Sequence, residues 1–326
     1  LFFSITIEKE INVSQIYESI DNKYINTLFS KEENFNYDKV KISNIIYSDL
    51  KEKDLLIINE INSFNDGFNN FISDYLKDGG SIAIIPIRDA NIENYNNLLT
   101  IINCEEINSE SLISSRISNL NTNHDIFKNT FKVKKLNRNL DLPNINYSYS
   151  LRGNLDIIKE SILSMETGEP FLNHYKNEDG NIYLFTSPIS IKNNDLYKHP
   201  LFVTIFFNMS INSVNTPELY YTIETNNMID IPKNRIDNQE IFKLKSDDTD
   251  IMMRYVDTKN NRSLKTSLIY SAGNYKLTQK NEIINNIAFN YNRDESNIDS
   301  YSVMTLRELI RKNPGINVWE TNKSYI

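Results

Sequence analysis

Residues 54–86, DLLIINEINSFNDGFNNFISDYLKDGGSIAIIP, are the stretch that most constrains the fold. The apolar run at 55–58 is typical of a strand buried on both faces. Apolar residues then recur at helical spacing from Phe64 to Leu76. Gly79 stands where a left-handed helix cap is needed, and Gly80 lets the chain turn into a second apolar strand at 81–87. This order predicts a βαβ unit with parallel strands.

The rest of the first two thirds of the chain extends this pattern. The hydrophobic spacing predicts further elements, and Asp179-Gly180 marks a hairpin between two strands. The expected strands are 1–7 and 37–43, and the expected helices are parts of 14–32, then 91–103 and 194–211. We therefore expect an α/β, flavodoxin-like domain over residues 1–212.

The pattern changes after NSVNTPE (212–218), which is the best candidate for a linker. From there to about residue 300, short strand-like segments alternate with turn residues at roughly ten-residue spacing, which is typical of a β-sandwich. An amphipathic helix over 302–313 is expected to end at Pro314-Gly315. The predicted second domain, residues 213–326, is therefore an immunoglobulin-like β-sandwich with a C-terminal helix.

Charge and cysteine content exclude several classes of function. The formal net charge is −8, which disfavours a nucleic-acid partner, and the short basic run at 128–138 is read as a solvated strand edge. No stretch approaches the roughly 18 apolar residues of a membrane span. One cysteine, Cys104, allows no internal disulfide, and with only three histidines it cannot supply a zinc cluster of the Cys/His type.

The few glycines exclude the common nucleotide-binding loops. The eight glycines form neither GxGxxG nor GxxxxGK[ST], and no serine elbow GxSxG is present. Cys104 lies beside Glu105 and Glu106, and neighbouring carboxylates disfavour a reactive thiolate, so a structural role is expected. No cofactor, metal or catalytic residue is predicted.

The polar residues at the ends of the two central strands are the remaining candidates for a site. Asn59 and Glu60 follow the first strand, and Arg88 and Asp89 follow the second. Ligands of open parallel sheets bind at the carboxyl ends of strands, so these four residues define a candidate ligand crevice. Glu8, at the end of the strand expected over 1–7, is expected at the same edge. The alternative is that they are ordinary loop residues, with Arg88 and Asp89 paired to each other.

Several stretches resemble one family. Residues 54–86, NKYINTLFSKEENF (22–35), NTNHDIF (121–127), HPLF (199–202) and IAFNYNRDESNIDSYS (287–302) are similar to bacterial membrane proteins that carry a BatA (aerotolerance-type) region. The similar part of those proteins is a class I glutamine amidotransferase-like domain. The resemblance implies a periplasmic ectodomain anchored by transmembrane segments outside this chain, with Trp319 approaching the membrane.

The same resemblance argues against amidotransferase chemistry. Active members of that class place a cysteine in a Gly-x-Cys-x-Gly elbow after the second strand, where this chain has Pro86, Ile87 and Arg88. The preceding loop has Asn59, Glu60 and Ile61 instead of glycines that supply oxyanion donors. No catalytic residue is carried over.

Three functions follow from these observations. The leading expectation is a non-catalytic ectodomain that serves as a protein-interaction or assembly module of the cell envelope, with an envelope protein as its unknown partner. The second is a module that binds a small polar ligand or carbohydrate in the strand-end crevice. The third is a hydrolase, which requires His124, His174 or His199 within hydrogen-bond reach of Glu60 or Asp89. His124 and His199 also suit helix starts.

Overall fold

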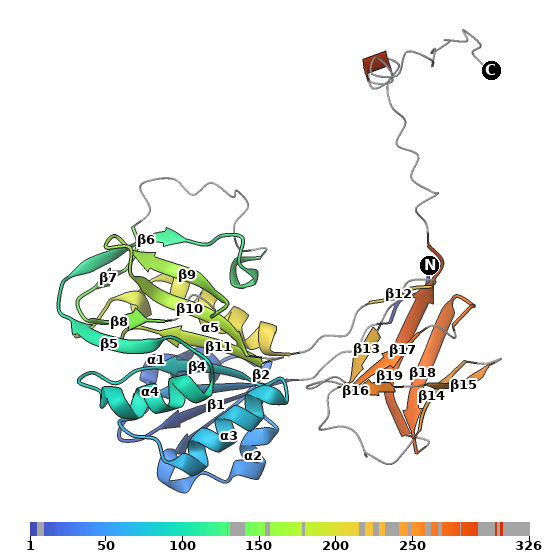
Figure 1. The fold of residues 1–326 in the computed structure, drawn as a ribbon, viewed down its shortest axis with the longest axis horizontal. Coiled ribbons are helices and arrows are strands. Elements are labelled where there is room, and N and C mark those ends of the chain that lie inside the picture. The colour runs from blue at the N-terminus through green and yellow to red at the C-terminus, as the bar shows by residue number, and fades with distance from the viewer. Residues whose placement is uncertain are drawn as a thin grey trace.

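The computed structural model contains two units (Figure 1). Residues 10–214 form a mixed α/β unit, which confirms the α/β class expected for this part, and residues 219–292 form a smaller β-rich unit. The structure describes residues 1–4, 10–128, 130, 141–153, 157–177, 180–214, 219–223, 228–231, 241–246, 249–253, 255–257, 262–266, 269–280, 282–292, 304 and 307–308.

A nine-stranded sheet forms the centre of the α/β unit. Its order is β2-β1-β3-β4-β11-β10-β9-β6-β7. The strands are β1 (Ile11–Tyr17), β2 (Phe35–Lys41), β3 (Leu55–Asn59), β4 (Ser81–Ile85), β6 (Ser115–Leu120), β7 (Asn144–Ile145), β9 (Lys159–Met165), β10 (Pro170–Asn177) and β11 (Gly180–Phe185). A separate antiparallel pair is formed by β5 (Glu106–Ser111) and β8 (Ser148–Arg152).

The first five strands of this order are parallel and the rest are antiparallel. The parallel part has the doubly wound arrangement, and the strand order reverses between β1 and β3. Strands β3 and β4 pair in register from Leu55 with Ser81 to Asn59 with Ile85, and every residue of both is buried. The two strands therefore end level with each other at the carboxyl edge of the sheet, as the βαβ prediction required.

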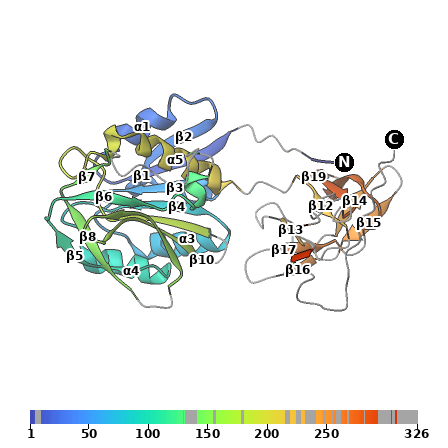
Figure 2. The same ribbon diagram turned by 90° about the horizontal axis from the view of Figure 1, so that it is seen from above.

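Helices cover both faces of the sheet. Figure 2 shows α1 and α5 on one face and α3 and α4 on the other. The helices are α1 (Lys23–Phe29), α2 (Tyr47–Lys51), α3 (Asp66–Lys77), α4 (Ile92–Ile101) and α5 (Pro200–Ser213), with short 3-10 turns η1 (Ile42–Asn44), η2 (Asp125–Phe127) and η3 (Leu196–Lys198). The side chain of Asn65 caps the start of α3, and Gly79 after its end has φ 88°, as expected from the sequence.

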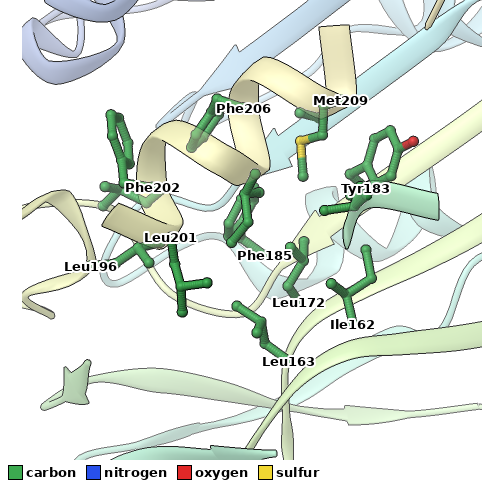
Figure 3. Close-up of a cluster of buried hydrophobic side chains, with 14 of the residues drawn as sticks. Ile162, Leu163, Leu172, Tyr183, Phe185, Leu196, Leu201, Phe202, Phe206 and Met209 are labelled. Atoms are coloured by element: carbon green, nitrogen blue, oxygen red, sulfur yellow. The ribbon is translucent and has the colours of Figure 1, made fainter. Parts of the chain in front are cut away.

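Helix α5 seals one face with aromatic and aliphatic side chains. Phe202, Phe206 and Met209 lie against Phe185 and Leu172 of the sheet, and all five are buried (Figure 3). Burying one such side chain contributes about 1.5–3 kcal/mol. The apolar block at 200–211 is thus a core helix.

The β-rich unit contains two sheets that share one core. A five-stranded sheet has the order β12-β19-β18-β14-β15, and a three-stranded sheet has the order β13-β17-β16. Ile229 and Leu264 of the smaller sheet belong to the same buried cluster as Phe242, Leu244 and Phe289 of the larger one. The strands are β12 (Tyr221–Thr222), β13 (Met228–Ile231), β14 (Phe242–Lys245), β15 (Asp250–Met253), β16 (Tyr255–Asp257), β17 (Arg262–Lys265), β18 (Gly273–Gln279) and β19 (Glu282–Asn290).

The start of the chain differs from the expectation. Residues 1–4 form no strand and bond to the β-rich unit: the Phe2 N–H donates to Asn290 Oδ1 at 2.8 Å, Asn290 Nδ2 donates to the Phe2 carbonyl at 2.7 Å, and the Ser4 N–H donates to the Leu219 carbonyl at 2.9 Å. The buried strand predicted over 1–7 is therefore wrong for these four residues. The chain links the two units twice, once after residue 4 and once after residue 214.

The first strand of the sheet lies where the sequence analysis expected helix in part. β1 occupies 11–17, and its central Ser14 and Gln15 are fully buried. The Gln15 side chain is satisfied there, because its amide donates to Asn26 and Tyr37 and its oxygen accepts from the Asn22 N–H. These tertiary hydrogen bonds make Gln15 compatible with a buried strand, which hydrophobic periodicity alone does not indicate, whereas the buried Ser14 Oγ has no hydrogen-bond partner.

Other predictions involve residues that are largely outside the described part. The helix over 302–313, the tail around Trp319, and most of the basic run at 128–138 belong to this group. The domain boundary at 212/213 stays a prediction. Among the described residues, no helix combines the length and the apolar character that crossing a bilayer requires.

Candidate functional site

The four predicted site residues lie at the carboxyl edge of β3 and β4. Asn59 is the last residue of β3 and Glu60 follows it, whereas Arg88 and Asp89 lie in the loop after β4. Glu60 has φ 47° and Asp89 has φ 55°, a left-handed backbone that non-glycine residues rarely adopt. Adjacent strands therefore end in two strained residues, a feature that clusters at functional sites. Glu8 lies outside the described residues.

The Tyr95 hydroxyl on α4 joins the two strand-end loops. It accepts a hydrogen bond from the Ile87 N–H at 3.1 Å and donates to the Ile61 carbonyl at 2.5 Å. Burial raises the pKa of Tyr95, so this hydroxyl keeps its proton and both bonds. The loop after β3 is thereby fixed to the loop after β4.

Two further tyrosines bond the loop after β4. Tyr149 lies in β8, and Tyr147 directly precedes that strand. The Tyr149 hydroxyl donates to the Ile87 carbonyl at 2.7 Å and accepts from the Ala90 N–H at 2.9 Å. The Tyr147 hydroxyl accepts from the Asp89 N–H at 3.1 Å. The backbone N–H groups of residues 87, 89 and 90 thus all have tyrosine partners.

Arg88 reaches across to the loop after β11. Its Nη1 donates to Asn193 Oδ1 at 3.1 Å, and its guanidinium lies 4.6 Å from the centre of the Tyr147 ring. Its Nε is 4.0 Å from Asp89 Oδ2, too far for a hydrogen bond, and the side chains of Arg88 and Asp89 are 42% and 77% exposed. The predicted Arg88–Asp89 pair is therefore a loose contact, worth about 0–1 kcal/mol.

Glu60 and Asn59 differ in their surroundings. Burial raises the pKa of the Glu60 carboxyl to about 7, so this group is partly protonated at neutral pH. Asn59 is buried, and its Oδ1 lies 3.5 Å from the Nδ2 of Asn22, which also donates to the Ile189 carbonyl at 3.0 Å. The loops after β1, β3 and β11 thus meet at this point.

Glu18 also lies at the carboxyl edge of the sheet, although the sequence did not indicate it as a site residue. It follows β1, and its Oε2 accepts a hydrogen bond from the Asn62 N–H at 2.7 Å. Glu18 and Glu60 both add to the rise in the pKa of Tyr95 that burial causes. Two carboxyl groups therefore flank the switch point between β1 and β3. The sequence does not point to Glu18, because the pattern over 14–32 predicts helix in parts and no strand that ends before this residue.

The three histidines are engaged elsewhere. Nδ1 of His124 accepts from the Ile126 N–H, and Nδ1 of His199 accepts from the Leu201 N–H, so both start helical turns as expected. The Nε2 of His199 bonds the Asp141 carbonyl, and His174 bonds His124 and Asn181. All six ring nitrogens have partners other than Glu60 and Asp89, so the geometry that the hydrolase reading requires is not formed.

Cys104 lies apart from this edge in the core beneath α4. Burial raises the pKa of its thiol well above the ordinary value, and Glu105 adds to the effect. Glu106 instead forms an ion pair with Arg152 at 2.9 Å. These surroundings agree with a structural cysteine. Within the described part of the chain, no three His, Cys, Asp or Glu side chains gather into a group that suits a metal ion.

Comparison with known proteins yields similarity of structure only. No family model and no curated protein matches the chain. A cytoplasmic protein of Salmonella typhimurium LT2 is similar at 13% identity and TM-score 0.48, over 62% of this chain and 99% of that one. A thua-like protein of Bacteroides uniformis is similar at 14% identity and TM-score 0.46, over 63% of this chain and 92% of that one. A beta-galactosidase of Bacillus circulans is similar at 12% identity and TM-score 0.45, over 79% of this chain and 41% of that one. At these values the comparisons carry no argument about activity.

Proposed function

We propose that this chain is a non-catalytic protein-interaction module of the cell envelope. Its α/β unit is assigned to the class I glutamine amidotransferase-like group and its β-rich unit to the β-sandwiches. The observation that carries the proposal is a set of exposed aliphatic side chains on the hydrogen-bonded carboxyl edge of the sheet. The resemblance to BatA-type proteins supports a periplasmic location and membrane anchoring by segments outside this chain.

The loop after β4 supports the absence of amidotransferase chemistry. In an active enzyme of that class, backbone N–H groups near the nucleophile stabilise the oxyanion. Here Pro86 has no N–H, and the N–H groups of residues 87, 89 and 90 already donate to tyrosine hydroxyls. The loop is built as a rigid support and offers no nucleophile of the Cys or Ser type.

The aliphatic side chains at this edge form what we name the distal surface: Ile20, Leu112, Ile113 and Ile191. Their exposed fractions are 79%, 68%, 70% and 64%. Ile20 follows β1, Leu112 and Ile113 lie between β5 and β6, and Ile191 follows β11. Single exposed aliphatic residues are common, so the proposal depends on the position of these four in loops at the same edge of the sheet.

Hydrogen bonds join the loops that carry the distal surface. Asn22 bonds the Ile189 carbonyl next to the Ile191 loop, and the Asn146 N–H donates to the Asn193 carbonyl at 2.7 Å. Ser114 Oγ in turn donates to Asn146 Oδ1 at 3.4 Å. A surface held in this way loses little conformational entropy when a partner binds, which favours affinity.

The connections to the β-rich unit leave from the opposite edge. β1 begins at Ile11 on the amino edge of the sheet, and α5 runs back from the carboxyl edge and ends at Ser213 (Figure 1). The distal surface is thus turned away from both connections. This arrangement leaves it accessible to another protein.

Site-specific photo-crosslinking in cells tests the proposal. A photoreactive amino acid replaces Ile113 or Ile191 in the full-length protein, and crosslinked proteins are identified by mass spectrometry. The matched control is Ile158, which is 82% exposed and precedes β9 on the amino edge. We expect the same envelope protein at both distal positions and not at position 158.

The purified partner then allows a quantitative check. Ile113→Glu and Ile191→Glu each place a charge in the contact and are expected to weaken binding at least tenfold, whereas Ile158→Glu leaves the Kd unchanged. Crosslinks that are equally frequent at position 158, or affinities unaffected by both distal changes, contradict the proposal.

A small-ligand site at the switch point is a second candidate, favoured by Glu60. A carboxyl that is partly protonated near pH 7 both donates and accepts hydrogen bonds, which suits hydroxyl groups of a neutral sugar. The test is a calorimetric titration with a panel of neutral mono- and disaccharides at pH 6 and pH 8. Binding that is stronger at pH 6, with Glu60→Gln losing that pH dependence, supports this candidate, and the absence of binding by the whole panel removes it.

A further inference from the structure

Two buried histidines on the α5 face form a hydrogen-bonded pair. His124 Nε2 lies 2.9 Å from His174 Nδ1, and the ring planes are nearly perpendicular, at 89°. His124 immediately precedes η2, and His174 lies in the middle of β10. His124 is 5% exposed and His174 is 8% exposed. Neither residue belongs to the distal surface or to the strand-end crevice.

The neighbours of this pair determine where its protons lie. The Ile126 N–H donates to His124 Nδ1 at 3.2 Å, so that nitrogen carries no proton and the His124 proton is on Nε2. His124 Nε2 therefore donates to His174 Nδ1, and the His174 proton lies on Nε2, which donates to Asn181 Oδ1 at 3.1 Å. Asn181 Nδ2 continues the chain to Ser81 Oγ at 3.3 Å.

This arrangement admits only neutral imidazoles. A proton added to His174 Nδ1 points at the N–H of His124, and a proton added to His124 Nδ1 points at the N–H of Ile126. Either event replaces a hydrogen bond by two donors facing each other inside the protein, which is strongly unfavourable.

Each element around the pair contributes charged or polar groups. Asp125 lies in η2, Glu160 lies opposite His174 on β9, and Lys176 is on β10. From β11, the Tyr183 ring stacks on His174 with the ring centres 4.8 Å apart. The two carboxylates favour the charged imidazole, whereas burial and Lys176 oppose it.

The histidine pair fastens a segment that also contacts α5. Asn208 Nδ2 of α5 donates to the Ile126 carbonyl at 2.6 Å, and Ile126 and Phe127 are buried in the core on this side of the sheet. We propose that the His124–His174 hydrogen bond is an acid-sensitive contact that holds residues 124–128 on β10 and α5 at neutral pH and releases them when either ring is protonated.

The lowered pKa values of the two histidines determine how closure of residues 124–128 depends on pH. Burial lowers the pKa of His174 to about 4 and also lowers that of His124, from an ordinary value of 6.5. The closed state therefore binds fewer protons than the open state between pH 4 and 6.5, so closure weakens as the pH falls through this window. A shift of this size changes the open-to-closed ratio by about two orders of magnitude.

Nuclear magnetic resonance and hydrogen exchange on the whole chain test this inference. At pH 7.5, ¹⁵N spectra are expected to show both rings with the proton on Nε2. Between pH 7 and pH 4, the Ile126 amide, corrected for the intrinsic pH dependence of exchange, is expected to lose at least tenfold protection relative to the amides of β4. A ring with its proton on Nδ1, or unchanged relative protection at pH 4, overturns the proposal.

Three variants distinguish acid opening at the His124–His174 hydrogen bond from acid destabilisation of the whole protein. The double variant His124→Asn, His174→Asn removes both titrating groups and is expected to abolish the pH dependence at Ile126. Asn181→Asp places a carboxylate beside His174 Nε2 in both the closed and the open state, because β10 and β11 stay paired when residues 124–128 leave. The pKa of His174 then rises in both states, so opening is expected at higher pH, a readout that does not require the double variant to fold. His199→Asn retains an acceptor at the start of α5 and is expected to leave acid opening at Ile126 intact. An unmoved midpoint in Asn181→Asp contradicts the proposal.

Discussion

At the residue scale, the most informative side chain is Glu60. Its position after β3 was predicted from the apolar run, but its environment was not. Its backbone has a left-handed φ of 47°, and burial raises the pKa of its carboxyl to about 7. The sequence shows that a glutamate follows the strand but not how exposed its carboxyl is. Desolvation of the carboxyl sets its pKa and therefore its charge.

Glu60→Gln is expected to stabilise the protein at alkaline pH. The raised pKa means that the folded state binds more protons than the unfolded state between about pH 4.5 and 7, so ionisation above this window costs stability. Removing the charge is expected to raise the free energy of unfolding by about 1–2 kcal/mol at pH 8, with little change at pH 4. Urea denaturation at the two pH values measures this, and equal effects at both would argue against a raised pKa.

Gly180 is a position where close approach of the backbone excludes a side chain. A Cβ there lies 2.6 Å from the Leu76 carbonyl oxygen and 2.9 Å from that of Gly80. Gly180→Ala is therefore expected to cost about 2–4 kcal/mol, because backbone atoms must shift.

Gly67→Ala in the first turn of α3 is the matched control for Gly180→Ala. Its Cβ has 3.3 Å to the nearest atom, a side-chain oxygen of Asn65, and alanine favours helix. The expected change in the free energy of unfolding is within about 1 kcal/mol of zero. Thermal denaturation of both variants checks the pair, and similar losses in the two would contradict the backbone-clash explanation.

At the element scale, strands with continuous apolar runs and helices with clear caps were predicted well. β3, α3, β4 and α4 are formed where the pattern placed them. The strand expected over 1–7 was wrong for residues 1–4, and β1 was not predicted, whereas the helix expected in parts of 14–32 is formed as α1. In both cases the stabilising contacts come from distant segments: Asn290 for residues 1–4, and Tyr37, Asn22 and Asn26 for Gln15.

Asn290→Ala is expected to loosen the attachment of the N-terminal segment to the β-rich unit. The Asn290 side chain bonds both the N–H and the carbonyl of Phe2, and the residue is buried. Losing both bonds is expected to cost about 1–2 kcal/mol. Hydrogen exchange should increase in β12 and β19 and remain unchanged in β3 and β4.

Asn274→Ala, an exposed position on the neighbouring strand β18, serves as the control for Asn290→Ala. It is expected to leave exchange in β12 and β19 unchanged. Faster exchange in the α/β unit of Asn290→Ala would show that residues 1–4 stabilise the first unit instead.

At the scale of the whole molecule, two titrations with opposite signs act on stability. The lowered pKa of His174 makes stability rise with pH between about 4 and 6.5, and the raised pKa of Glu60 makes it fall with pH between about 4.5 and 7. The two contributions oppose each other over the range from about 4.5 to 6.5.

Because the two contributions oppose each other, the stability of each single variant is expected to depend more strongly on pH than that of the wild type. Glu60→Gln is expected to show urea midpoints that increase from pH 4.5 to 6.5, and His174→Asn midpoints that decrease over the same range. The wild-type profile is expected to be flatter than either. Parallel profiles for all three proteins would contradict both pKa assignments.

The sequence by itself determined the α/β class, the βαβ unit at 54–86, and the position of Asn59, Glu60, Arg88 and Asp89 at the ends of adjacent strands. These follow from hydrophobic periodicity and glycine placement, which are local properties. Tertiary structure alone decided that three tyrosine hydroxyls fasten the loop after β4 and that His124 meets His174 from 50 positions away. Such contacts join residues far apart in the chain, so no local pattern records them.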